Sequence, residues 1–217
     1  MALHDLGELY LDQIRDLYSA ETQIVDALPK LIEAASHEQL RAGFQHHLDQ
    51  TREHVRRLEQ IAQRLNEDAD GKTCHGMKGL LKEGKETMKE REDSDVLDAA
   101  LIADAQRVEH YEIAAYGTAI AHARLLELDG VVNLLEETLE EEKEADRKLT
   151  ALHSLATNRF LNGPVLNALQ RTTVDDVQLV HLKIEHQYVA IEETKAKTNA
   201  TGRPTPAKPA KPQPADG

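Results

Sequence analysis

The chain has 217 residues with only two Phe, five Tyr and no Trp, whereas Ala, Leu, Glu, Lys and Gln are abundant. This composition favours helices and argues against an all-β sandwich or barrel. The formal net charge of −13 repels nucleic acid and anionic lipid. We therefore expect no nucleic-acid partner and no membrane partner.

The cysteine content and the first residues indicate the cellular compartment in which the protein is found. Cys74 is the single cysteine, which excludes an intrachain disulfide framework and a Cys-rich zinc or iron–sulfur site within one chain. No apolar run reaches the roughly 18–20 residues that span a bilayer, and MALHDLGELY lacks the basic start and apolar stretch of a secretory signal. We expect a cytoplasmic protein.

The first half of the chain predicts a pair of long helices. A helix is predicted over residues 5–35, because apolar residues recur there at helical spacing. Pro29 lies inside this segment, where it removes one backbone hydrogen bond and should bend the axis or mark a weaker last turn without ending the pattern. A second helix is predicted over 38–66, where Phe44 and Leu58 belong to one apolar stripe.

The second half predicts another pair after a crossover. The segment NEDADGKTCHG supplies turn residues, and a short helix is predicted over 76–91. A third long helix spans 95–127 and ends at the turn pair Asp129 and Gly130, and a fourth spans 131–157. Two tightly joined pairs with a longer crossover between them indicate an all-α, antiparallel four-helix bundle with a short helix in the central crossover.

The pattern changes after the fourth long helix. Asn162, Gly163 and Pro164 are predicted to interrupt the helix, and helical spacing resumes over 173–196. The Pro-, Ala- and Lys-rich tail lacks a face that could be buried and is predicted to be disordered. The predicted domains are the bundle over 1–157, a linker with an additional C-terminal helix over 158–198, and the tail over 199–217.

Acidic residues interrupt the apolar stripes near the middle of the long helices. Glu21 lies one helical turn from Leu17 and from Ile24, so it should face inward. An isolated buried carboxylate costs several kcal/mol or takes up a proton, so a cluster of them needs a partner. The candidate metal ligands on the inner stripes are Glu21, Gln50, His54, Glu109, Glu112, Glu142 and Asp146.

A bound cation is the partner that this pattern indicates. Carboxylates and imidazole from facing helices suit iron or manganese, and bridging carboxylates hold a pair of such ions roughly 3.5–4 Å apart. Glu21 precedes His54 by 33 residues and Glu109 precedes Glu142 by 33, so two hairpins present these residues at the same height. If Glu112 takes the place of Glu109, the ligand positions of the two helix pairs still match to within one residue. Both alignments therefore stay open.

Other interpretations apply to neighbouring residues. With 39 acidic residues in the chain, some fall near an apolar stripe by chance. His47 is interpreted as a hydrogen-bonded core or surface histidine, and His110 points away from the stripe. Tyr18 and Tyr111 are near presumed ligands in the sequence, and they are interpreted as core tyrosines that could also donate hydrogen bonds or electrons.

Five blocks of sequence, in order, carry a resemblance to a known family. They are DLYSAETQIVDALPKL, FQHHLDQTREHVRRLEQI, CHGMKGLLKEG, DAALIADAQRVEHYEIAAYGTAI and LLEETLEEEKEADRKLTAL. Over about residues 5–157 the chain resembles the YciE/YciF family of ferritin-like proteins. The resemblance implies a ferritin- or rubrerythrin-like bundle, a homodimer, an association with bacterial stress responses and a diiron or ferroxidase role.

The resemblance also bears on individual ligands. The family commonly shows Glu-Glu-Thr where this chain has Asp49, Gln50 and Thr51, so Gln50 would be a neutral and weaker ligand for which His54 can compensate. The strict Glu-x-x-His motif of ferritin-like proteins is absent from the second and fourth long helices. The family's acidic positions fall on Glu21, Glu109, Glu112, Glu142 and Asp146.

Three functional hypotheses follow. The leading one is a stress-response protein whose bundle binds two iron ions, or manganese, and reacts with peroxide or dioxygen as a ferroxidase or peroxide scavenger. The alternative is a metal-poor structural or interaction bundle without catalysis, which Gln50 and the C-terminal segments favour. A miniferritin that protects DNA ranks lowest, because the body of the protein is acidic.

Overall fold

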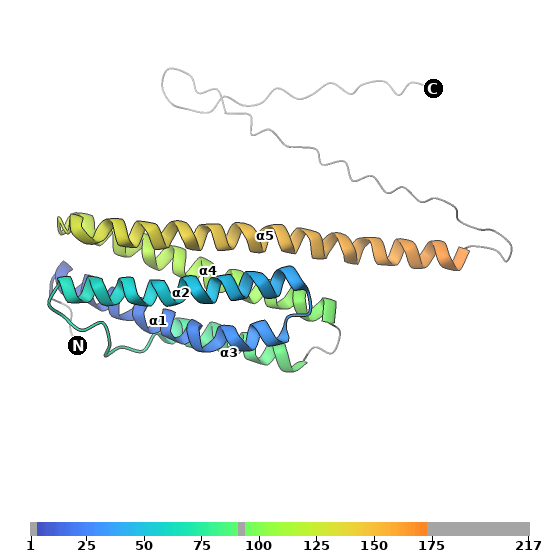
Figure 1. Ribbon diagram of the computed structural model, residues 1–217, viewed down its shortest axis with the longest axis horizontal. Coiled ribbons are helices and arrows are strands. Elements are labelled where there is room, and N and C mark those ends of the chain that lie inside the picture. The colour runs from blue at the N-terminus through green and yellow to red at the C-terminus, as the bar shows by residue number, and fades with distance from the viewer. Residues whose placement is uncertain (1–3, 91–93, 173–217) are drawn as a thin grey trace, which may run out of the picture. The chain divides into compact units, whose positions relative to one another are not determined.

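The computed structural model describes residues 4–90 and 94–172 of the chain (Figure 1). These residues form helices and no strand, as the composition predicts. None of the helices in this described part combines the length and the apolar character that crossing a membrane requires. In chain order the helices are α1 (Leu6–Ala34), α2 (Glu38–Arg64), α3 (His75–Glu90), α4 (Ser94–Leu125) and α5 (Asp129–Thr172).

The four long helices form a ferritin-like bundle. Helix α1 packs against α2 and α4, and α5 packs against α4 and α2. Short turns join α1 to α2 and α4 to α5, and each of these pairs is antiparallel, whereas α2 and α4 run in the same direction (Figure 1). A longer connection that contains α3 makes this parallel step possible, and α3 packs against α4 and α1. The predicted bundle and its crossover helix are confirmed.

The turn between α1 and α2 is fastened to α4 by one buried side chain. Asp98 in α4 is 6% exposed and accepts hydrogen bonds from the Ser36 backbone N–H at 2.8 Å, the Ser36 hydroxyl at 2.6 Å and the His37 backbone N–H at 2.8 Å. These bonds satisfy donors at the start of α2 that have no partner within the helix. The carboxylate therefore joins the two helix pairs at this end of the bundle.

Helix α5 is longer than the sequence pattern predicts. Its backbone stays helical to Thr172, past the predicted end at residue 157, and includes Asn162, Gly163 and Pro164. The prediction of an interruption at these three residues was wrong, because a proline removes one backbone hydrogen bond and a long helix can absorb that loss by bending. The predicted helix over 173–196 and the tail over 199–217 lie outside the described residues.

The apolar core is divided into two clusters along the bundle. Leu17 belongs to one cluster and Ile24 to the other, and Glu21 lies between them in α1. In α2, Leu48 and Leu58 are divided in the same way. Between the two clusters is a band of side chains, which we call the buried polar layer. It consists of Glu21, His47, His54, Glu109, Glu112 and Glu142.

Candidate metal centre

The buried polar layer brings ligand atoms from α1, α2, α4 and α5 together. Every one of its residues is at most 8% exposed. One group of donor atoms, all within 4.8 Å of one another, comes from His47, Glu109, Glu112 and Glu142. A second such group comes from Glu21, His54 and Glu142. Glu142 belongs to both groups, so the layer has the arrangement of two adjacent cation sites with a shared carboxylate.

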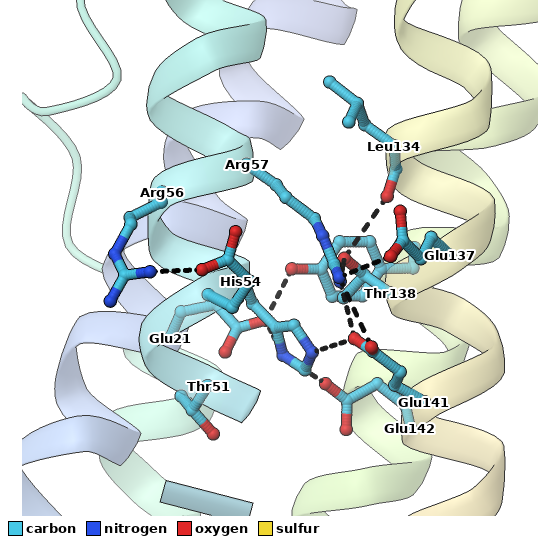
Figure 2. Close-up of polar contacts among 12 residues, drawn as sticks. Glu21, Thr51, His54, Arg56, Arg57, Leu134, Glu137, Thr138, Glu141 and Glu142 are labelled. Atoms are coloured by element: carbon cyan, nitrogen blue, oxygen red, sulfur yellow. Dashed lines mark hydrogen bonds and ion pairs between the residues drawn. The ribbon is translucent and has the colours of Figure 1, made fainter. Parts of the chain in front are cut away.

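His54 occupies the middle of the second group (Figure 2). Its Nδ1 lies 2.8 Å from Glu142 Oε1 and 3.5 Å from Glu21 Oε1, while its Nε2 donates to Glu141 Oε2 at 2.8 Å. Burial alone would lower the pKa of His54, but the charge of Glu21 and the hydrogen bonds to Glu141 and Glu142 outweigh it and raise the pKa to about 12. Without bound metal, the imidazole is therefore positively charged.

Glu141 and Arg57 support His54 from the side away from the layer. Arg57 donates to Glu141 Oε2 at 2.5 Å, to Glu137 Oε1 at 2.8 Å and to the Thr138 hydroxyl at 3.1 Å (Figure 2). Partial burial would raise the pKa of Glu141, but its hydrogen bonds from His54 and Arg57 lower it to about 2. Glu141 is thus a fixed anion that orients the ring, and it leaves Nδ1 facing the layer.

Glu21 is also held by a neighbour from another helix. The Tyr116 hydroxyl in α4 donates to Glu21 Oε1 at 2.5 Å, and both side chains are almost fully buried. Burial and the charge of Glu21 raise the pKa of Tyr116 well above its usual range. Tyr116 therefore stays protonated and fixes one oxygen of Glu21.

The first group of donors is less well paired. His47 Nε2 lies 3.4 Å from Glu109 Oε1, and burial lowers the pKa of His47. Burial and the charge of Glu142 raise the pKa of both Glu109 and Glu112 well above the usual range. These two acids hold protons in the metal-free protein, whereas the nearby imidazolium of His54 keeps the pKa of Glu142 low despite its burial.

Unsatisfied atoms in the layer test whether its residues fit a metal. When the acids are ionised, no residue that the structure describes donates a hydrogen bond to either oxygen of Glu112, to Oε2 of Glu21 or to Oε2 of Glu109. Glu142 Oε1 forms the ion pair with His54, whereas its Oε2 has no partner within the described part of the chain. Buried polar atoms are nearly always satisfied, so these oxygens need a partner. Carboxylate oxygen and imidazole nitrogen are the donors that iron and manganese accept, so the residues fit such ions.

The structure brings five of the predicted ligands together and leaves two outside. Asp146 is half-buried, lies 3.2 Å from His110 and accepts from Gln106 at 3.3 Å. Gln50 is half-buried and lines a pocket beside the layer. The structure also includes both acids between which the two registers left a choice. The predicted ligands that belong to the buried polar layer are Glu21, His54, Glu109, Glu112 and Glu142.

Two members of the site were missed. His47 belongs to the layer, against its interpretation as an ordinary core or surface histidine, and it stands seven residues before His54 on the same face of α2. Tyr116 stands four residues after Glu112 on the same face of α4, but periodicity alone does not distinguish it from an ordinary core tyrosine. The two tyrosines singled out from the sequence bond elsewhere, Tyr18 to Glu59 at 3.3 Å and Tyr111 to Asp16 at 2.8 Å.

Comparisons with known proteins place the chain. Residues 5–162 match the domain of unknown function DUF892. The chain is 42% identical to Protein YciF of Escherichia coli (strain K12) over 153 residues, which make up 70% of this chain and 92% of that protein. The crystal structure of the E. coli stress protein YciF superposes with a TM-score of 0.70 and 41% identity, covering 72% of this chain and 99% of that one.

Two further solved structures are similar. YcfI from Rhodopseudomonas palustris, provisionally described as a structural protein, has a TM-score of 0.67 and 46% identity over 68% of this chain and 94% of its own. A protein from Xanthomonas campestris has a TM-score of 0.61 at 17% identity, over 74% of this chain and 99% of its own, and so shares the fold. The chain therefore belongs to the DUF892 family and is a relative of YciF, as its five sequence blocks predict.

Proposed function

We propose that the buried polar layer binds a pair of iron ions, or of manganese ions, and that the bound pair reacts with a small oxidant, dioxygen or peroxide. The observation that supports this proposal most is the shared position of Glu142 in two groups of donor atoms whose other oxygens are unsatisfied. A carboxylate between two ions is how dinuclear centres are held in helical bundles. The E. coli relative is called a stress protein, which supports a role in a stress response here.

Each side chain has a distinct task in this proposal. Glu109 and Glu112 release their protons when cations bind, so metal uptake should liberate protons. His54, oriented by Glu141, must likewise give up the proton on Nδ1 before that nitrogen can coordinate. When bound, a pair of ferrous ions supplies the electrons that reduce the oxidant. Tyr116 keeps Glu21 in place throughout.

Substitution of the shared carboxylate tests the proposal. After anaerobic reconstitution with ferrous ion, the protein is expected to hold about two ions per chain, and Glu142→Gln is expected to lose both, because each donor group loses an anion. Glu144→Gln is the matched control, since Glu144 lies on the same helix and bonds only the surface residue Lys148 among the described contacts. Elemental analysis gives the stoichiometry, and absorbance after addition of dioxygen or peroxide reports oxidation.

Two results of the metal analysis would contradict the proposal. Fewer than about 0.2 ions per chain in the reconstituted protein would exclude a resident metal centre. Equal loss of metal in Glu142→Gln and Glu144→Gln would show that binding is a property of the acidic surface instead. Circular dichroism of both variants verifies that the helices are intact.

A structural or interaction bundle is the second candidate. The R. palustris relative, at 46% identity, is provisionally described as a structural protein. Without a metal, the crowded acids only cost stability, so replacing Glu112 by Leu should raise the free energy of unfolding. If Glu112→Leu raises stability in metal-saturating buffer as much as it does in chelator, the structural function is favoured.

The assembly is proposed to be a homodimer, as the family resemblance implies. With a chain mass of 24.2 kDa, a dimer would sediment at about 48 kDa. A twelve-subunit shell would sediment at about 290 kDa, and this result would support a cage instead.

A further inference from the structure

An apolar pocket lies beside the first group of donors. Its volume is about 60 Å³, and its wall is built mainly from aliphatic and aromatic side chains of the bundle core. Its lining includes Ile24, Leu28, Leu40, Phe44, Val108 and Leu149. His47 and Glu109 also line it, so the pocket reaches the buried polar layer. Exposed lining residues, among them Gly43 and Lys148, place its other end at the surface.

Small residues keep this pocket open. Each of the four long helices contributes one to the lining, namely Ala27 in α1, Gly43 in α2, Ala105 in α4 and Ala145 in α5. A Cβ atom built on Gly43 would have no atom within 4 Å, so the space beside this exposed residue, at the outer end of the pocket, is open. Ala145 follows Glu142 by three residues, which is the spacing at which a larger side chain would reach toward the same layer.

Two unpartnered polar atoms mark the inner end. His47 Nε2, which lies 3.4 Å from Glu109 Oε1, and Glu109 Oε2 belong to residues that are 8% and 2% exposed, and neither atom forms a hydrogen bond among the described residues. The lining therefore changes from apolar to ligand atoms within one pocket. A molecule that travels along the pocket arrives next to the proposed metal pair.

The chemistry of the wall selects the occupant. A cavity needs only about 10–15 Å³ to hold one water-sized molecule, so this pocket has room for a diatomic molecule. Peroxide donates and accepts hydrogen bonds, and the wall offers too few partners to replace those lost from water. Dioxygen makes no such bonds and loses none, and apolar cavities bind small apolar gases readily.

We propose that this pocket is the access and holding site for dioxygen, and that dioxygen is the oxidant of the centre. This inference rests on the proposed metal site. In the reaction, dioxygen accepts one electron from each of two ferrous ions and two protons from solvent, and leaves as hydrogen peroxide while both ions become ferric. Ala27, Gly43, Ala105 and Ala145 keep the path open, and the apolar wall determines the specificity for dioxygen.

Xenon tests the pocket without any metal. Crystals of the metal-free protein under xenon pressure are expected to show xenon between Leu28, Phe44 and Val108, and Gly43→Leu is expected to lower its occupancy because the new side chain covers the exposed end of the pocket. Gly79→Leu is the matched control, since Gly79 is another exposed helical glycine with open space and does not line the pocket. Absence of xenon from the wild-type pocket would overturn the proposal.

Oxidation rates test the choice of oxidant. In ferrous-loaded protein, Gly43→Leu is expected to slow oxidation by dioxygen about tenfold or more while oxidation by peroxide and the number of bound ions stay unchanged. Equal slowing with both oxidants, or with neither, would contradict the assignment of dioxygen.

The xenon and metal measurements together distinguish the two proposals. If the wild type binds xenon but no metal, the proposed metal function fails and the pocket remains. If it binds metal but no xenon, the pocket proposal fails alone.

Discussion

His54 is held from both sides of its imidazole ring. Glu141 accepts from Nε2 at 2.8 Å, and Nδ1 faces Glu142 and Glu21. In a metal site this arrangement fixes which nitrogen is available for the ion and removes the rotational freedom that binding would otherwise have to freeze. Arg57 in turn donates to Glu141, so its guanidinium fixes the carboxylate that orients His54.

Removal of Glu141 should therefore weaken metal binding without removing a ligand. Glu141→Ala is expected to lower the affinity for ferrous or manganous ion by about 10- to 100-fold, because His54 loses its orienting partner. Glu137→Ala is the control, since Glu137 is on the same helix and bonds the same arginine but does not contact His54 among the described pairs. Competition with a chelator measures the affinity. Equal weakening in both variants would assign the effect to Arg57 instead.

The sequence pattern predicts the acids of this layer better than its other members. A carboxylate inside an apolar stripe is conspicuous, which is why Glu21, Glu112 and Glu142 could be found. A histidine or tyrosine fits a core stripe without conflict, so His47 and Tyr116 give no such signal. Asp146 was included because it follows Glu142 by four residues, but that spacing turns the helix by roughly 40° and brings the side chain to the edge of the bundle.

Helix α3 depends on a glycine for its close approach to α4. A Cβ on Gly76 would lie 2.9 Å from Tyr111 Cε2. The ring cannot easily move away, because its hydroxyl donates to Asp16 at 2.8 Å and lies 2.9 Å from Cys74 Sγ. Gly76 therefore sets how closely the crossover helix can pack on the bundle.

A pair of substitutions in α3 separates packing from helix propensity. Gly76→Ala is expected to lower the free energy of unfolding by about 1–3 kcal/mol, because the added methyl group overlaps the Tyr111 ring. Gly79→Ala is expected to raise it by up to about 1 kcal/mol, since nothing lies within 4 Å and alanine favours the helix. Urea denaturation followed by circular dichroism gives both values. A gain in both variants would show that the ring accommodates the methyl group.

The sequence was sufficient to predict that each helix exists, but it did not predict where α5 ends. Apolar periodicity and turn residues give the bounds of α1, α2, α3 and α4 to within two residues, because capping and turn chemistry are local. Pro164 is equally local evidence for a break, yet the single hydrogen bond that it removes did not end α5. The division into domains over 1–157, 158–198 and 199–217 stays a prediction.

For the whole bundle, short and long connections were sufficient to predict the topology. Short turns require antiparallel neighbours, and the crossover that contains α3 permits a parallel step between α2 and α4. The heights at which acids from different helices meet depend on how the helices slide against each other. One sequence left two registers open for that reason, and the packed structure places Glu109 and Glu112 in the same group.

The metal-free fold should become less stable as pH rises. Glu109 and Glu112 have raised pKa values in the folded protein, so above the ordinary value of 4.5 the folded state binds more protons than the unfolded state. His54, with a pKa of about 12 in place of 6.5, acts in the same direction above about pH 6.5. His47, whose pKa is lowered by burial, acts in the opposite direction around pH 6.5, but it is one group against three, so the free energy of unfolding in chelator is expected to fall between about pH 5 and pH 8.

Urea titrations across this range, with and without metal, measure the effect. Glu112→Gln is expected to flatten the pH dependence, because the amide cannot ionise, whereas Glu144→Gln at the surface should leave it unchanged. Saturating metal should reverse the slope, since its binding is favoured by loss of protons. A stability that rises with pH in chelator would show that these two acids are ionised in the folded protein.

The shared position of Glu142 also limits how many ions one chain can accept. Four buried carboxylates, those of Glu21, Glu109, Glu112 and Glu142, carry four negative charges when ionised, which two divalent cations neutralise completely. A third divalent cation would find no further carboxylate in the buried polar layer to bind it. On this count of carboxylates, two divalent ions fill the layer, so storage of more iron would require sites outside it.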